Sequence, residues 1–133
     1  MKGLDLIGVG AANVDLIAKV EELPRPDEEV KVRELSISGG GSAANVSVGV
    51  SRLGLRAGFL GNVGKDHFGR LLLEEFRREG VDISKVRVLE GRTGLALCIV
   101  NGAGERAILA YGGVNSDFSL ANVDEDYVKE ARA

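Results

Sequence analysis

The stretch Gly39-Gly40-Gly41-Ser42-Ala43-Ala44-Asn45 decides the fold, because a run of extended sequence ends there and a helix begins. Three consecutive glycines have no Cβ to keep a ligand away from the backbone, and they adopt positive φ at little steric cost. The helix that follows is predicted to carry Val46, Val50 and Leu53 on one face and to end at Gly54. Its first N–H groups would point at whatever the loop binds. The stretch therefore predicts a ligand-binding loop, although many α/β proteins use such a loop only to turn the chain.

The composition limits the class of protein. With 133 residues, 44% of them hydrophobic, and only two prolines, the chain is expected to form one soluble globular unit with a core. The net charge is −3, from 17 Lys and Arg against 20 Asp and Glu, so neither nucleic acid nor an anionic membrane is expected as a partner. We expect no signal peptide at the start of the chain, and no apolar run approaches the ~20 residues needed to span a bilayer. The single cysteine excludes an internal disulfide, and we expect a cytoplasmic protein.

Two core strands are expected, at residues 4–10 and 56–61, where short apolar runs end in glycine. Gly8-Val9-Gly10 suggests a dinucleotide-binding turn, but the third glycine is missing and the residues after it look extended rather than helical. A P-loop is also excluded, because Phe59 stands where that motif has glycine and Lys65 precedes an aspartate.

Four further extended runs predict a second, smaller sheet. Residues 14–20 and 30–37 read as strands separated by a proline-containing loop, with a bulge expected at Arg33-Glu34, where the apolar phase changes. Residues 93–111 contain two more β-rich runs joined by Asn101-Gly102, which is a strong hairpin signal. We expect these strands to form a lid inserted beside the core sheet.

A second helix is expected from Asp66, which is well placed as its N-cap, to Gly80. Its buried stripe would be Phe68, Leu72 and Phe76, and its solvated face Glu74, Glu75, Arg77 and Arg78. His67 is expected at the surface or in a capping role. A short helix is expected at residues 124–132. The alternation of strands and helices predicts an α/β sheet with helices on both faces, of which only two or three core strands are present.

Several of these motifs occur together in one known family. The pair Gly40-Gly41 is followed by Ala43, Asn45, Ser47, Gly54 and Gly64. With the overlapping run Gly61-Asn62-Val63-Gly64-Lys65-Asp66-His67-Phe68-Gly69, this spacing resembles the first signature of the ribokinase-like (PfkB) family of carbohydrate and nucleoside kinases. Asn13-Val14-Asp15, Thr93-Gly94 and Gly112-Gly113-Val114-Asn115 are also similar to that family, so the resemblance covers nearly the whole chain.

The resemblance implies the N-terminal part of a ribokinase-like, Rossmann-like α/β sheet with a small β-sheet lid. Residues 1–133 would be part of one kinase domain, with lid strands at about 14–37 and 94–111. The implied activity is phosphoryl transfer from ATP, with Mg²⁺, to a hydroxymethyl group of a sugar, sugar acid or nucleoside. A missing C-terminal half would supply the nucleotide site, the metal-linked motif and the catalytic aspartate. The chain alone is therefore expected to be inactive, with no catalytic, cofactor-binding or metal-binding residue and no bound ATP or Mg²⁺.

By the same resemblance, this chain would carry the acceptor-binding half of the site. Asp15 is the leading candidate, because a carboxylate accepts hydrogen bonds from two neighbouring hydroxyls at once; the alternative is a solvated or capping aspartate. Asn13 would orient the turn or the ligand, and Asn45 would use its amide toward the ligand or merely cap its helix. The other candidates are Gly40 and Gly41, which would offer backbone amides, their neighbour Ser42, and the lid residues Ala96 and Cys98.

The two lid candidates have alternatives of their own. Ala96 and Cys98 could line an apolar wall over the sugar, or they could serve core or dimer packing, and Cys98 is expected to be a small buried hydrophobe. The lid strands carry much apolar surface, so we expect a homodimer through them. The residues concerned are Val30, Val32, Leu35, Ile37, Leu97, Ile99, Ile108 and Leu109.

A hypothesis from another class is that the chain is a non-catalytic sugar-binding or regulatory fragment, which binds a polyol or another subunit. Both hypotheses leave the ligand open, since ribose, fructose phosphates, sugar acids and nucleosides are handled by similar loops in the family that the sequence resembles.

Overall fold

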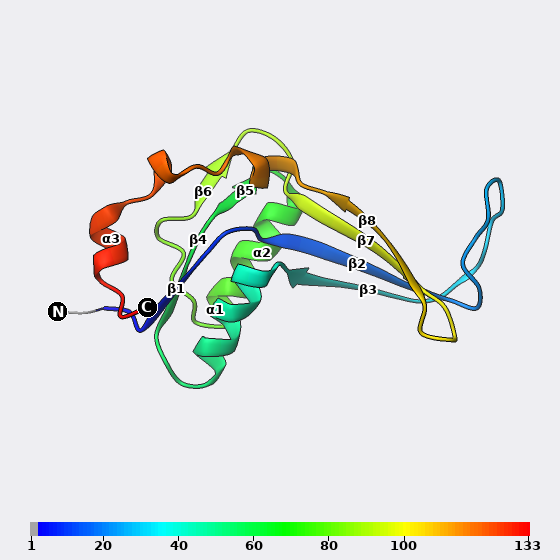
Figure 1. Cartoon of the computed structure of the whole chain (residues 1–133), viewed down its shortest axis with the longest axis horizontal. Helices are drawn as coiled ribbons and strands as arrows, with labels where there is room; N and C mark the ends of the chain where they lie inside the picture. Colours follow the sequence, from blue (N-terminus) through cyan, green and yellow to red (C-terminus); the bar gives the residue numbers. More distant parts are fainter. Residues whose placement is uncertain (1–2) are drawn as a thin grey trace.

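One end of the molecule holds two short parallel sheets of two strands each, which meet at Gly61 and are together called the core sheet. The computed structural model describes residues 3–133, and Figure 1 shows the arrangement of its elements. The strands are β1 (Leu6–Val9), β4 (Ala57–Leu60), β5 (Asn62–Gly64) and β6 (Arg87–Leu89). β1 pairs in parallel with β4, and β5, which follows β4 after one residue, pairs in parallel with β6. The core strands predicted at 4–10 and 56–61 are thus present.

The other end is a four-stranded lid that projects away from the helices and from both termini (Figure 1). Its strands are β2 (Asn13–Val20), β3 (Val32–Gly40), β7 (Gly94–Val100) and β8 (Arg106–Tyr111), in the order β3-β2-β7-β8. β2 and β7 run parallel at the centre, and each is joined to its outer neighbour by antiparallel pairing. The extended runs expected from the sequence are these four strands.

The bulge expected in β3 lies at Arg33. The residues opposite Lys19 and Val20 are Glu34 and Val32, which leaves Arg33 without a partner in β2. The extra residue keeps the apolar side chains before and after it on one face of the lid. The exposed large side chains of that face are Val32, Leu35, Ile37, Leu97, Leu109 and Tyr111.

Helix α1 (Ser42–Arg52) buries a different face from the one that its large apolar residues suggested. Val46 is 50% exposed and Leu53 is 81% exposed, whereas Ser47 is fully buried. The reason is that α1 lies directly on β1 at Gly8, where an added Cβ would collide with the hydroxyl of Ser47. Only small side chains fit between a helix and a strand at this separation, so Val46 and Leu53 lie on the exposed side of α1.

The ends of α1 and α2 (His67–Arg78) follow their local signals. The Asp66 side chain caps α2 by accepting the N–H of Gly69 at 2.8 Å. Gly54 (φ +90°) and Gly80 (φ +75°) take the left-handed conformation just past the ends of α1 and α2. These three predictions are confirmed, because capping residues act within one or two turns of the chain.

Helix α2 packs its predicted stripe on the sheet. Leu72 and Phe76 are 2% and 3% exposed, and Phe68 packs against the same core. Phe76 stacks on Phe59 of β4 with ring centroids 4.9 Å apart. Glu75 departs from the prediction of a solvated face, because it is half-buried and turns toward the lid.

The opposite face of the sheet is covered by α3 (Glu125–Lys129). Its Tyr127 is buried against Leu4 and Leu60, and its hydroxyl donates to Asp82 at 2.6 Å. Burial, and then the bond to Asp82, raise the pKa of Tyr127 above its usual range. Helices therefore cover both faces of the sheet, as predicted.

Helix α3 is shorter than the predicted 124–132 because the residues after it join the sheet. Ala131 forms a parallel bridge with Leu4, and the Ile7 N–H donates to the carbonyl of Ala133 at 2.8 Å. Two 3₁₀ turns, η1 (Gly113–Asp117) and η2 (Leu120–Asn122), connect β8 to α3.

The predicted lid hairpin is present, but its turn differs in detail. The residue in the left-handed conformation is Gly104 (φ +80°), not Gly102, and the side-chain oxygen Oδ1 of Asn101 accepts the N–H groups of Ala103 and Glu105. Cys98 is half-buried in the lid, not fully buried as the prediction of a small buried hydrophobe required. Within residues 3–133, no helix combines the length and the apolar character needed to cross a membrane.

Candidate functional site

Asp15 lies where the lid meets the core sheet, with its carboxylate against the backbone of Gly40. A Cβ added to Gly40 would lie 2.7 Å from Oδ1 of Asp15 and nearer still to Oδ2, so only glycine leaves room for this carboxylate. Asp15 is half-buried, and its oxygens have no hydrogen-bond or ion-pair partner among residues 3–133. A carboxylate has about four accepting positions. Those of Asp15 are therefore open to a ligand.

The strand register brings most of the predicted lid residues onto the face that carries Asp15. Asp15 pairs with Ala96 of β7, and Asn13 pairs with both Gly40 and Gly94. Cys98 lies two residues beyond Ala96 and shares its face, because side chains alternate along a strand. The side chain of Asn13, like that of Asp15, makes no hydrogen bond within the described chain.

The loop after β3 opens directly onto the N-terminus of α1. Gly41 has φ +103°, and a Cβ on it would lie 3.1 Å from the Cα of Ala12, so this position requires glycine for both conformation and space. Gly41 is also the N-cap residue and has no side chain to cap the helix. Ser42, the first helical residue, is exposed. The first N–H groups of α1 therefore face the loop without a side-chain partner from it.

Asn45 occupies a different position from Asp15. It is exposed in the first turn of α1, and its N–H donates to the carbonyl of Gly41 at 2.8 Å, while its side chain makes no hydrogen bond among the described residues. Asn45 lines a pocket of about 390 Å³ between α1, α2 and the end of β3. That pocket does not include Asp15. The structure therefore brings Asn13, Asp15, Gly40, Ala96 and Cys98 to one face and leaves Asn45 and Ser42 on the adjoining helix.

Asn115 holds the turn that leads into β2. Its side-chain amide accepts the N–H of Ala12 at 3.3 Å and donates to the carbonyl of Ala12 at 3.1 Å. Gly94 of β7 leaves the space that this amide occupies. Asn115 was noticed in the sequence only as part of a motif, and the structure shows that it fixes the backbone one residue before Asn13.

Asp66 joins α2 to the start of β7. Besides capping α2, its carboxylate accepts the N–H of Thr93 at 2.9 Å and the Thr93 hydroxyl at 2.6 Å. That hydroxyl in turn accepts the N–H of Gly64 at 2.9 Å. Burial raises the pKa of Asp66, but the bonds from Thr93 and Gly69 outweigh it and hold the pKa below its ordinary value.

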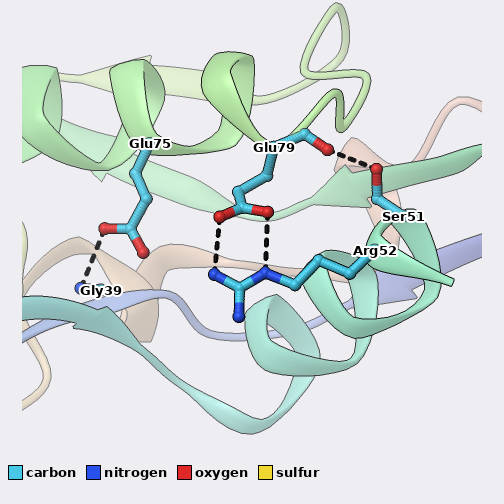
Figure 2. A network of polar contacts seen from close by, with 5 residues as sticks. All are labelled: Gly39, Ser51, Arg52, Glu75 and Glu79. Carbon is cyan, nitrogen blue, oxygen red and sulfur yellow. Dashed lines mark hydrogen bonds and ion pairs between the residues drawn. The ribbon is translucent and has the colours of Figure 1, made fainter.

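Glu75 joins α2 to the end of β3, and no sequence signal marked it. Its Oε2 accepts the N–H of Gly39 at 3.0 Å, a contact between residues 36 positions apart (Figure 2). The two strands that lead into the lid from the site, β3 and β7, are thus each tied to α2 by a carboxylate. In the part of the chain that the structure describes, no group of three or more His, Cys, Asp and Glu side chains could hold a metal ion.

Comparisons with known proteins show the family and the fold of the chain. The chain is 36% identical over 127 residues to an ATP-dependent ribose-1-phosphate kinase of Halopiger xanaduensis, and 36% identical over 135 residues to a 5-dehydro-2-deoxygluconokinase of Geobacillus kaustophilus. These alignments cover 95% and 98% of this chain but 43% and 39% of the relatives. The structure of Arabidopsis thaliana ribokinase complexed with ribose and ATP superposes with a TM-score of 0.85 at 28% identity, over 96% of this chain and 43% of that one.

The ribokinase of Thermotoga maritima gives a TM-score of 0.86 at 27% identity, over 96% of this chain and 42% of that one. The chain therefore has the ribokinase fold and spans about 40% of the length of the relatives that it matches. Residues 4–133 match the description pfkB family carbohydrate kinase. The family resemblance of the sequence is thus confirmed, and the chain belongs to the pfkB family of carbohydrate kinases.

Proposed function

We propose that this chain is the acceptor-binding part of a kinase that transfers a phosphoryl group from ATP to a hydroxymethyl group of a sugar, sugar acid or nucleoside. The observation that carries the proposal is the half-buried carboxylate of Asp15, whose oxygens have no partner among residues 3–133 and lie beside Asn13 and the glycine loop. A carboxylate can accept hydrogen bonds from two neighbouring hydroxyls of a polyol at once, and such charge-assisted bonds are about twice as strong as neutral ones. The two curated relatives named above are kinases of a sugar phosphate and a sugar acid, which fits this class of acceptor.

Each candidate residue would make a different contact with the acceptor. Asp15 would accept two hydroxyl protons, Asn13 would orient the same part of the ligand, and the first N–H groups of α1 would bind an oxygen at the loop. Ala96 and Cys98, on the same lid face, would form the apolar wall over the sugar ring. Phosphoryl transfer depends mainly on positioning and on excluding water, and a lid serves both purposes.

The part proposed for this chain is to bind the acceptor. ATP and Mg²⁺ would be bound elsewhere in the full-length protein, where the catalytic aspartate would also lie. We accordingly propose that residues 1–133 alone have no kinase activity.

We also propose that two copies pair through the apolar lid face. Leu35 is 62%, Ile37 50%, Leu109 65% and Tyr111 54% exposed on this face, which is opposite to the face of Asp15. An apolar patch of this kind on a projecting sheet is a site for association.

The test is a phosphorylation screen of the full-length protein with ATP and Mg²⁺ over sugars, sugar phosphates, sugar acids and nucleosides. We expect ATP-dependent transfer to a compound that carries a hydroxymethyl group. A protein that binds one of these compounds in calorimetry and phosphorylates none of them would instead be a non-catalytic sugar-binding or regulatory protein.

A further inference from the structure

Two carboxylates contact the backbone of two consecutive glycines, and they do so on opposite faces of the lid. Asp15 rests on Gly40, and Glu75 rests on Gly39, where an added Cβ would lie 2.7 Å from Oε2 and 3.0 Å from Oε1 of Glu75. Gly39 does not have positive φ. Glycine is therefore needed at this position for space and not for conformation. Because it has no side chain, the Glu75 carboxylate can reach the backbone.

The helix that carries Glu75 is itself fixed on several sides (Figure 2). The C-cap residue of α2 is Glu79, whose carboxylate accepts two hydrogen bonds from the Arg52 guanidinium, at 2.9 and 2.6 Å. The backbone carbonyl of Glu79 accepts the hydroxyl of Ser51. Beside Glu75, Phe76 is anchored in the core. The carboxylate of Glu75 is thus a fixed point from which the end of β3 can be held.

The hydrogen bond to Glu75 lies only one peptide unit away from the residue that contacts Asp15. Glu75 accepts the N–H of Gly39, and the next residue is the one against which the Asp15 carboxylate lies. Bonds to an ionised acceptor are about twice as strong as neutral ones, so this bond favours one position of the β3 backbone. If it is lost, the end of β3 is held by its pairing with β2 alone, and Gly40 and the loop that follows can shift relative to Asp15.

We propose that Glu75 is a positioning residue for acceptor binding. It fixes the end of β3 so that Gly40 and the loop N–H groups are placed to contact the same acceptor molecule as Asp15. This inference rests on the proposed function, since it concerns the same acceptor site. Glu75 does not touch the face of the lid that carries Asp15, and it acts through Gly39.

The test uses the full-length protein and the acceptor found in the screen. Glu75→Ala is expected to weaken acceptor binding, measured by calorimetry without ATP, by roughly three- to tenfold, the range of one hydrogen bond. Glu75→Gln keeps an oxygen that can accept the Gly39 N–H but loses the charge, and it should restore part of the affinity lost in Glu75→Ala. Glu74→Ala removes an exposed carboxylate from the same turn and is the matched control, with no change expected. The KM for ATP should stay the same in all three variants.

A double-mutant cycle separates positioning from general destabilisation. In an Asp15→Ala background, Glu75→Ala should weaken acceptor binding much less than it does alone, because the two residues act on the same backbone. Hydrogen exchange of the ligand-free protein should show faster exchange of the Gly39 amide in Glu75→Ala and not in Glu74→Ala.

Full additivity of the two substitutions, or equal acceptor affinity of Glu75→Ala and the wild type, would overturn the inference while leaving the proposed function intact. A wild-type protein that binds no sugar, sugar acid or nucleoside would overturn the proposed function and this role together. An unchanged exchange rate at Gly39 would remove the physical basis of the inference whatever the acceptor.

Discussion

Removing the Asp66 carboxylate should cost more than the loss of an ordinary helix cap. In Asp66→Ala, the Gly69 N–H loses its capping partner, which by itself costs about 1 kcal/mol of unfolding free energy. Thr93 is only 2% exposed, and its N–H and hydroxyl proton would then lie buried without the acceptor that they have now. Leaving a buried donor unsatisfied costs about 1–3 kcal/mol. We therefore expect a total loss of roughly 2–4 kcal/mol.

The chain offers a matched control in a second capping aspartate. Asp124 caps α3 by accepting the N–H groups of Asp126 and Tyr127, and it pairs with the exposed Lys85 at 3.0 Å. Surface ion pairs contribute little, so Asp124→Ala should cost about 1 kcal/mol, close to the cap alone. Urea unfolding of the full-length protein at neutral pH measures both variants. Equal losses would refute the reasoning, because they would show that the bonds to Thr93 add nothing.

The contribution of Asp66 to stability depends on pH with a definite sign. The native pKa of Asp66 is lowered, so the folded protein binds this proton less readily than the unfolded chain. The stabilisation is then fully present above the unfolded pKa of about 4 and is lost as the pH falls through the lower native value. The difference in stability between the wild type and Asp66→Asn should shrink below about pH 4 and stay constant above about pH 5. A difference that grows on acidification would contradict the assigned hydrogen bonds.

Three further predictions concern packing and assembly. Tyr127→Phe keeps the buried ring but removes the bond to Asp82, and it should lower the unfolding free energy in urea by about 1–2 kcal/mol; no loss would show that the bond is not formed in solution. Phe76→Ala empties a site that is 3% exposed and should cost about 3–5 kcal/mol in the same measurement, while a loss under about 1 kcal/mol would contradict its burial in the core. Leu35→Lys with Leu109→Lys places two charges on the apolar lid face and should convert a dimer into a monomer in analytical ultracentrifugation; a wild-type protein that is monomeric at micromolar concentration would contradict the dimer.

Local signals explain what could be predicted from the sequence. The cap at Asp66 and the helix ends at Gly54 and Gly80 depend on residues within two turns, so their positions were predicted correctly. The bulge at Arg33 was visible because the apolar phase of a strand changes where a residue is inserted. The register of β2 and β7, which places Ala96 opposite Asp15, is a pairing between distant segments and could not be read from either segment alone.

Contacts between distant segments explain what could not be predicted. The buried face of α1 is set by its close approach to Gly8, so small Ser47 is buried and large Leu53 is exposed, against the apolar periodicity. Glu75 stands among other charged residues of α2, and nothing in its neighbours separates it from Glu74, which is exposed. Its role follows only from the fold, which places its carboxylate within hydrogen-bond distance of the Gly39 N–H.

The most direct test of the central claim is the affinity of the full-length protein for its acceptor, measured by calorimetry with and without the Asp15 carboxylate. If Asp15 binds the hydroxyls of the acceptor, Asp15→Ala should weaken binding by about 2 kcal/mol or more, roughly a 30-fold rise in Kd. Lys19→Ala is the control, because Lys19 lies on the same strand and the same lid face and is exposed, and it should leave Kd within about twofold. Equal affinities for wild-type protein and Asp15→Ala would contradict the claim that this chain binds the acceptor.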